Sequence, residues 1–265
     1  MTNVIPQCDL LLLVATDSEE AALKGCATLA GIALTEQQSS LGPYYDLGYV
    51  GDHRVFAIRT RIGAFNHGGS AFTAIAFRSA TSATGIIQLG MAFGIDREHQ
   101  HHGDVLISAS LFPYDQREVK DGGDGPFVDY SRTPRRFAHR TLLAMFEREI
   151  RRGGHSFGVE VGTLLSGGAR ISSSAYRDQL VSSVPAGRHV VIGGEMEGMG
   201  LLAVARADDR IWILVKGISD FAEKESTDPE SRTSACRNAA SFVLSAIMND
   251  ARDRRDAAPG SGAAS

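Results

Sequence analysis

Cysteine is scarce in this 265-residue sequence, which also lacks an excess of positive charge and any long apolar run. The cysteines Cys8, Cys26 and Cys236 are widely spaced and form no CxxC pair, which argues against a disulfide framework and against a thiolate zinc site. Residues 1–8 lack the basic start and cleavage site of a signal peptide, and no apolar run approaches the roughly 20 residues that cross a bilayer. We therefore expect a cytoplasmic protein with no membrane partner.

Acidic residues slightly outnumber basic ones. The sequence has 27 Lys and Arg against 31 Asp and Glu, a formal net charge of −4. Binding to nucleic-acid phosphates requires clustered positive charge, so a small-molecule partner is expected and a nucleic acid is not. We predict one catalytic domain over residues 1–250. A disordered tail is predicted over 251–265, because charged residues followed by Pro, Gly, Ser and Ala bury too little apolar surface to order the chain.

Short apolar runs alternate with amphipathic segments along the chain. The runs predict strands over 9–15, 45–49, 54–58, 84–89, 104–108, 159–165, 189–192 and 211–215. The amphipathic segments predict helices over 19–30, 63–80, 133–152, 197–206 and 231–249. The polar, Gly-rich segment 114–134 is expected to be a long loop. This order implies a sheet between helix layers, with ligands at the strand ends.

Carboxylates follow three of the predicted strands. Asp17 and Glu19 follow the first, Glu195 and Glu197 follow strand 189–192, and Asp220 follows strand 211–215. They could converge on a ligand at one edge of the sheet. They could equally cap helices and complement the helix dipole, and their spacing leaves both interpretations open.

The motifs that contain these carboxylates resemble a known family. Segments 194–198 (GEMEG) and 215–220 (VKGISD) are similar to the paired signature of the purine nucleoside phosphorylase and methylthioadenosine/S-adenosylhomocysteine nucleosidase superfamily. Further matching segments, in the same order, are 14–19 (VATDSE), 90–94 (GMAFG), 103–105 (GDV) and 166–171 (SGGARI). The resemblance covers residues 9–223. It implies an α/β fold, a three-layer α/β/α sandwich with a central mixed, partly barrel-like sheet.

The resemblance also implies roles for particular residues. Asp220 matches the acid that protonates the departing purine, and Glu19 matches the residue that orients or deprotonates the attacking water. Glu197 matches the carboxylate that holds the ribose hydroxyls, and Met196 is expected to pack on the ribose face. Protonating the base has a physical rationale, because negative charge develops on it as the glycosidic bond breaks. The remaining expected substrate contacts are Met91, Ala92, Arg170, Ile171, Glu195, Lys216 and Ser219.

Several residues depart from the family pattern and bear on the choice between water and phosphate. Met91 stands where relatives have a hydroxyl or a nearby arginine, and methionine cannot donate a hydrogen bond to phosphate. Arg59 and Arg61 precede Gly63 near the expected nucleophile site, and keep phosphorolysis open unless they simply face solvent. Lys216 replaces the usual arginine of the VKGISD segment and could supply charge to that site.

The loop expected to bind the base also departs from the family. Arg170 occupies the position of an aromatic residue that stacks on adenine in the similar nucleosidases. Its guanidinium could stack in the same way, or bind a phosphate or carboxylate on the substrate. Ile171 is expected to offer backbone groups to the base edge. The substrate is thus left open.

No metal or other cofactor is expected. His99, His101 and His102 are closely spaced, but we interpret them as part of a solvated loop, since a zinc site needs three or four converging ligands. Segment 114–117 resembles a subunit-interface segment of the family, in which a neighbouring subunit closes the pocket, so a homodimer is the minimal expectation.

These inferences predict an N-ribosyl hydrolase, a nucleosidase that acts on an adenosine-like purine nucleoside such as methylthioadenosine or S-adenosylhomocysteine. One alternative is a purine nucleoside phosphorylase that uses phosphate as nucleophile. Another is a non-catalytic nucleoside-binding homologue, which the unusual Met91 and Arg170 would fit.

Overall fold

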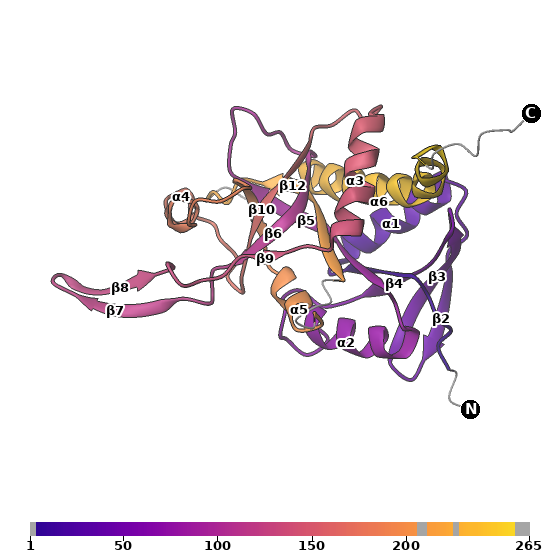
Figure 1. Cartoon of the computed structure of the whole chain (residues 1–265), viewed down its shortest axis with the longest axis horizontal. Coiled ribbons are helices and arrows are strands. Elements are labelled where there is room, and N and C mark those ends of the chain that lie inside the picture. Colours follow the sequence, from indigo (N-terminus) through magenta and orange to yellow (C-terminus); the bar gives the residue numbers. More distant parts are fainter. Residues whose placement is uncertain (1–3, 206–210, 225–227, 258–265) are drawn as a thin grey trace, which may run out of the picture.

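Figure 1 shows the fold in a computed structural model, which describes residues 4–205, 211–224 and 228–257. The strands are β1 Leu10–Val14, β2 Thr35–Ser39, β3 Gly42–Val50, β4 His53–Arg59, β5 Gly85–Gly94, β6 Val105–Pro113, β7 Glu118–Gly122, β8 Gly125–Asp129, β9 Arg136–Phe137, β10 Val159–Ser166, β11 Val191–Glu195 and β12 Trp212–Asp220. The helices are α1 Asp17–Leu29, α2 Ser70–Thr81, α3 Arg140–Arg152, α4 Ser174–Ser183, α5 Gly198–Leu202 and α6 Pro229–Ala257.

The main sheet is mixed and closes partly on itself. Its strand order is β11-β10-β6-β12-β5-β1-β4-β3-β2, and β11 pairs with β5 as well as with β10. That second pairing joins β5, β12, β6, β10 and β11 into a closed ring, while β1, β4, β3 and β2 extend the sheet from it. Helices cover the sheet on both sides, with α1, α3 and α6 opposite α2 and α5 (Figure 1). The predicted α/β architecture with a partly barrel-like sheet is confirmed.

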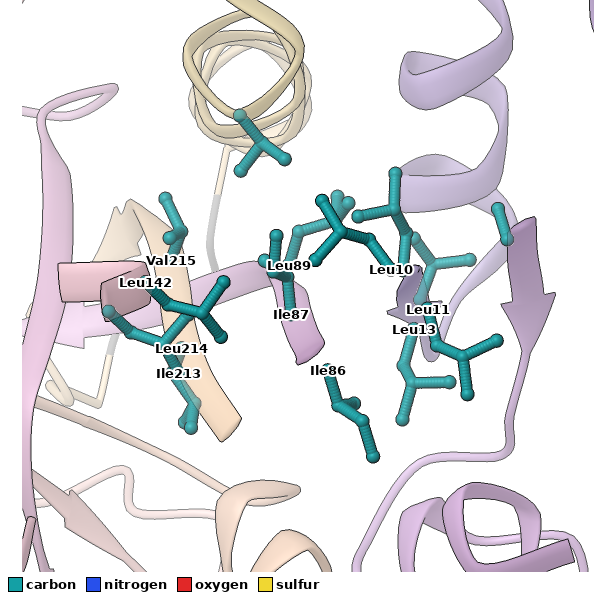
Figure 2. Packing of buried hydrophobic residues seen from close by; sticks show 14 of the residues in the cluster. Leu10, Leu11, Leu13, Ile86, Ile87, Leu89, Leu142, Ile213, Leu214 and Val215 are labelled. Carbon is teal, nitrogen blue, oxygen red and sulfur yellow. The ribbon is translucent and has the colours of Figure 1, made fainter. Parts of the chain in front are cut away.

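The central strands are apolar because both of their faces are covered. Every residue of β1 is buried, and Figure 2 shows its leucines beside the side chains of β5, with those of β12 on the other side of β5. The strands β1, β5 and β12 are mutually parallel. Burying a leucine or isoleucine side chain contributes about 1.5–3 kcal/mol, so this cluster fixes the strand order. Parallel strands bring their carboxyl ends to one edge, where the chemistry gathers.

The segment 114–134 differs from the loop that the sequence predicted. It contains the antiparallel hairpin β7–β8, which projects away from the rest of the molecule in Figure 1. The turn is built from Gly122, Gly123, Asp124 and Gly125, and Gly125 has a φ of 110° that favours glycine. The glycines that made the segment look like a loop are the turn of a hairpin.

The helix predictions are correct in position but wrong at several boundaries. Helix α2 begins at Ser70 rather than Gly63, because Gly63 and Gly68 have φ values of 92° and 76° that no helix accommodates. Helix α3 begins at Arg140 rather than at residue 133, since the His139 ring caps it by accepting from the Leu142 amide. Strand β9 takes up part of the preceding segment.

Three further differences concern helices. Helix α4 was not predicted at all. Helix α5 ends at Leu202, short of the predicted 206, which itself lies outside the described residues. Helix α6 runs to Ala257, so residues 251–257 are helical where a disordered tail was predicted, and residues 258–265 lie outside the described residues. Within the described ranges, no helix has the length and apolar character needed to span a membrane.

Candidate active site

The carboxyl ends of β1, β5, β11 and β12 surround a cavity of about 250 Å³. Most residues that the sequence predicted for the site line it, namely Glu19, Met91, Ala92, Arg170, Ile171, Glu195, Met196, Glu197, Ser219 and Asp220. Lys216 lies behind the wall and is fully buried. The structure therefore brings together carboxylates that are far apart in the sequence.

Glu19 caps a helix and also lines the cavity. Together with Thr16 it forms a capping box at the start of α1. One carboxylate oxygen accepts from the amides of Ala15 at 2.6 Å and Thr16 at 3.0 Å, and the other accepts from the Met91 amide at 2.9 Å. Gly90 permits this approach, because a Cβ there would lie 2.1 Å from Glu19 Oε1. The sequence left open whether these carboxylates cap helices or face a ligand site, and Glu19 both caps α1 and lines the cavity.

Lys216 joins the carboxylates from behind. Its Nζ donates to Glu197 Oε2 at 3.0 Å and lies 3.4 Å from Glu195 Oε2. Burial alone would lower the pKa of Lys216, but the carboxylates of Glu197, Glu195 and Glu19 outweigh burial and raise it. One ammonium group therefore serves three carboxylates. From the sequence, this lysine was expected to supply charge to the nucleophile site. In the structure its direct contacts are with Glu195, the last residue of β11, and with Glu197 just beyond that strand.

Glu195 and Glu197 have different surroundings. Glu195 accepts from the amides of Glu197 at 2.8 Å and Gly198 at 2.9 and 3.0 Å, so its carboxylate holds the turn into α5. Glu197 accepts from the Gly63 amide at 3.2 Å in addition to Lys216. Burial raises the pKa of both Glu195 and Glu19, the nearby Glu197 raises them further, and Lys216 opposes the shift. This end of the cavity is buried and holds three neighbouring carboxyl groups.

Asp220 occupies the opposite wall, at the end of β12. Its Oδ2 accepts from Ser219 Oγ at 3.0 Å, and its Oδ1 accepts from the Ala222 amide at 2.9 Å. Ala222 has a φ of 54°, which turns the chain sharply after the strand. Asp220 is only partly buried, in contrast to the glutamates opposite.

The loop after β10 forms the wall next to Asp220. Tyr114 donates from its hydroxyl to the Ala169 carbonyl at 3.0 Å, and Asp115 accepts from the Gly168 amide at 2.6 Å. The buried Tyr114 ring packs so closely that a Cβ at Gly167 would lie 2.3 Å from it. In this loop Ile171 is buried and Arg170 is exposed.

Sequence reasoning missed several residues of this site. The cavity is also lined by Thr16, Ile62, Phe93, Glu223 and Arg232. The capping-box spacing of Thr16 and Glu19 is a readable signal, since Ser or Thr three residues before Glu marks a helix start. The others follow from the folding of loops, for which the sequence holds no comparable pattern.

Arg177 is a further missed residue that supports the site without lining it. It lies on α4, is largely buried, and its Nη1 donates to the Phe221 carbonyl at 2.6 Å. Phe221 directly follows Asp220, so the guanidinium anchors the turn that holds the aspartate. Because α4 was not predicted, nothing in the sequence connected Arg177 with Asp220.

Arg59 and Arg61 line a neighbouring hollow rather than this cavity. Arg59 is paired with Asp17 at 2.5 Å and Glu20 at 3.2 Å. That hollow has a volume of about 900 Å³ and adjoins the cavity at Ile62, which lines both.

The closely spaced histidines have separate partners. His99 contacts Asp96 at 2.8 Å, and His101 lies 3.5 Å from Asp104. The Nδ1 atom of His102 and the Oγ atom of Ser231 share a hydrogen bond of 2.8 Å. Over the described ranges, no three His, Cys, Asp or Glu side chains form a group that could hold a metal ion.

Comparisons with known proteins agree with this geometry. A family model described as the phosphorylase superfamily matches residues 9–248. A 5'-methylthioadenosine/S-adenosylhomocysteine nucleosidase from Neisseria meningitidis superposes with a TM-score of 0.72 at 18% identity, covering 91% of this chain and 99% of that one. The S-adenosylhomocysteine nucleosidase of Streptococcus pyogenes gives 0.71 at 20% identity, covering 92% and 97%. Futalosine hydrolase of Helicobacter pylori gives 0.70 at 17% identity, covering 93% and 98%.

A curated relative is a death domain-containing ATP nucleosidase of Amphimedon queenslandica. The alignment is 189 residues long with 24% identity, and it covers 62% of this chain and 34% of that protein. The match thus spans about a third of the relative's length.

Proposed function

Because the chain belongs to the phosphorylase superfamily, we propose that it hydrolyses the N-glycosidic bond of an adenosine-like substrate and releases the free base. The observation that carries this proposal is the single cavity that Asp220 shares with Glu19 and Glu197. Relatives named as methylthioadenosine/S-adenosylhomocysteine nucleosidases and as an ATP nucleosidase support an adenine base. Residues 1–250 would act as one catalytic domain.

The proposed chemistry uses the two walls of the cavity differently. As the bond to the base breaks, positive charge develops on the sugar and negative charge on the base. Glu197 accepts hydrogen bonds from the ribose hydroxyls, and the buried carboxylates beside it favour the growing positive charge. Met196 packs against the ribose. Asp220 gives a proton to the departing base, with Ser219 and the Ala222 amide holding its carboxyl group in place.

Ala92 and Ile171 would contact the base, and Arg170 would contact a part of the substrate nearer the opening, since all three line the same cavity as Asp220 and Arg170 is exposed. Lys216 acts as a positioning residue, because its Nζ fixes Glu197 at 3.0 Å from behind. Glu195 likewise positions the turn through its contacts with backbone amides.

Water is the proposed nucleophile. A phosphate dianion needs several hydrogen-bond donors, but the amides of Ala15, Thr16 and Met91 already donate to Glu19. The Met91 side chain offers no donor. A phosphate beside Glu19 would also meet like charge, whereas a water molecule can donate a hydrogen bond to the carboxylate and be oriented by it.

A base-release assay tests this proposal. Purified protein is incubated with adenosine, methylthioadenosine, S-adenosylhomocysteine, AMP and ATP, with and without inorganic phosphate, and free adenine is measured. We expect release that does not depend on phosphate, and an Asp220→Asn variant with kcat lowered by about 10²–10⁴-fold. Release only when phosphate is present, with formation of ribose 1-phosphate, would instead identify a phosphorylase. Tight binding without release, unchanged by Asp220→Asn, would identify a non-catalytic binding protein.

We further propose that the protein works as a homodimer in the cytoplasm. Large apolar side chains are exposed around α2, with Phe65 at 60% and Phe72 at 61% exposure, and on the projecting hairpin, with Val119 at 64%. Such exposed apolar groups are typical of interfaces between subunits. Sedimentation velocity would show a species of twice the 28.3 kDa chain mass. The free thiols of Cys8, Cys26 and Cys236 support a reducing compartment.

A further inference from the structure

Two arginines stand at the mouth of the cavity. Arg170 comes from the loop after β10, and Arg232 comes from the first turn of α6. Both are exposed, and both line the same cavity although they are far apart in the sequence. Across the described part of the chain, neither guanidinium forms an ion pair or hydrogen bond.

The acidic residue at the cavity mouth, Glu223, pairs with arginines other than Arg170 and Arg232. Glu223 accepts two hydrogen bonds from Arg97, at 2.8 and 2.7 Å, and lies 3.9 Å from Arg177. Its charge is therefore balanced by those two arginines and does not neutralise Arg170 or Arg232. The other lining carboxylates belong to the interior of the cavity.

This arrangement is unlike that of the nearby Arg59, whose charge is balanced by Asp17 and Glu20. Exposed arginines that bind nothing are common on protein surfaces. Arg170 and Arg232 differ because two separate elements bring their charges to one opening, above an interior rich in carboxylates. A neutral nucleoside offers these guanidinium groups no anion, whereas a phosphate group accepts the planar, charged hydrogen bonds that arginine provides.

We infer that the substrate is a nucleotide, with a phosphate on the 5′ carbon of the sugar held between Arg170 and Arg232. This inference rests on the proposed function for the position of the base and sugar. The reaction then joins water to the anomeric carbon, and the products are the base and ribose 5-phosphate or its polyphosphate. The large hollow beyond Ile62 leaves room for a substituent that extends out of the cavity.

Free phosphate is another anion that these arginines could bind, and it would make the enzyme a phosphorylase. The position for a nucleophile lies beside Glu19, however, where the backbone amides are already taken by the carboxylate. Arg170 and Arg232 lie at the mouth instead. This position favours binding of a phosphate group that is part of the substrate over binding of a free phosphate that acts as the nucleophile.

A binding experiment tests the inference apart from turnover. Asp220→Asn protein is titrated with AMP and with adenosine by calorimetry, in buffer free of phosphate. We expect AMP to bind about a hundredfold more tightly than adenosine, about tenfold for each arginine. In Arg170→Gln and in Arg232→Gln that preference should fall by about tenfold each, because each variant removes one charge that contacts the phosphate. Arg151→Gln, which removes an exposed charge on α3, is the matched control and should keep the preference.

A turnover experiment with wild-type protein complements it. The ratio of kcat/KM for AMP to that for adenosine should exceed about ten and should fall in both cavity variants but not in Arg151→Gln. Equal affinity for AMP and adenosine, or equal losses for both ligands in the variants, would overturn the inference. Phosphate-stimulated cleavage of adenosine that the variants abolish would overturn it as well. If AMP binds with the expected preference but no substrate releases its base, the proposed function is wrong and the phosphate subsite stands.

Discussion

The two ends of the cavity are built in opposite ways. At the sugar end, Glu19, Glu195 and Glu197 are buried, their oxygens accept from backbone amides, and Lys216 balances part of their charge. At the mouth, the side chains of Arg170 and Arg232 are exposed, and their guanidinium groups form no ion pair or hydrogen bond within the described residues.

The protein itself pairs the charged groups at the sugar end, whereas it leaves those at the mouth available to a ligand. Buried charges must be paired and hydrogen-bonded within the protein, or the fold loses stability. Exposed guanidinium groups are solvated and carry no such penalty, so they are free to exchange water for an anion. Substitutions at the sugar end should therefore affect stability, and substitutions at the mouth should affect ligand preference.

The largest effect is expected for Lys216→Met. It removes the ammonium group shared by the buried carboxylates, and breaking a buried ion pair costs about 3–5 kcal/mol. The free energy of unfolding, measured by urea denaturation at pH 8, should fall by that amount. At pH 5 the loss should be smaller, because the carboxylates can then take up protons.

Lys24→Met is the matched control for this prediction. Lys24 forms an ion pair with Glu20 at 2.6 Å, but its side chain is 42% exposed. Exposed pairs contribute less than about 1 kcal/mol. Equal effects of the two substitutions would show that the network at the sugar end does not stabilise the fold in the way described.

The same contrast explains which parts could be predicted from the sequence. Glu19, Glu197 and Asp220 could be found because each lies within a few residues of the end of a predicted strand, in a segment that resembles a motif of the family. The contact of Lys216 with Glu197 could not be found, since it joins two strands across the sheet. Arg232 reaches the cavity through the placement of a whole helix, which no local pattern encodes.

The missed elements have a common physical cause. The hairpin β7–β8 and the helix α4 have mostly exposed residues, so their sequences lack the strong alternation of apolar and polar positions on which the other predictions depended. The start of α2 was wrong because small residues continue from Gly63 into the helix, and only the positive φ angles of Gly63 and Gly68 separate loop from helix. Burial patterns therefore predicted the core well and the loops that complete the site poorly.

A smaller loss of stability is expected when the contact of Arg177 with the turn after Asp220 is removed. Arg177→Ala removes the charged hydrogen bond to the Phe221 carbonyl, which should lower the free energy of unfolding by about 1.5–3 kcal/mol. Because the turn after Asp220 loosens, kcat for base release should fall as well. Asp178→Asn is the control, since Asp178 contacts the same arginine but is 62% exposed. An Arg177→Ala protein with wild-type stability and kcat would exclude the anchoring role.

The smallest effect concerns how stability depends on pH. Burial raises the pKa of Glu19 above its ordinary value of 4.5, so the folded protein favours the protonated carboxyl group more than the unfolded chain does. The stability that this group contributes is present below pH 4.5 and is lost as pH rises through the folded pKa. Wild-type protein should therefore lose stability relative to Glu19→Gln between pH 5 and pH 8, measured by urea denaturation.

Glu20→Gln provides the matched control one residue away. Although burial alone would raise the pKa of Glu20, hydrogen bonds from Lys24 and Tyr45 hold it below 4.5. The stability from Glu20 is lost only as pH falls below that range, so both folded and unfolded chains are ionised between pH 5 and pH 8. The difference between wild type and Glu20→Gln should stay constant there. A constant difference for Glu19→Gln as well would mean that Glu19 is no less easily ionised in the folded protein than in the unfolded chain, and the contrast between the two ends of the cavity would lose its electrostatic basis.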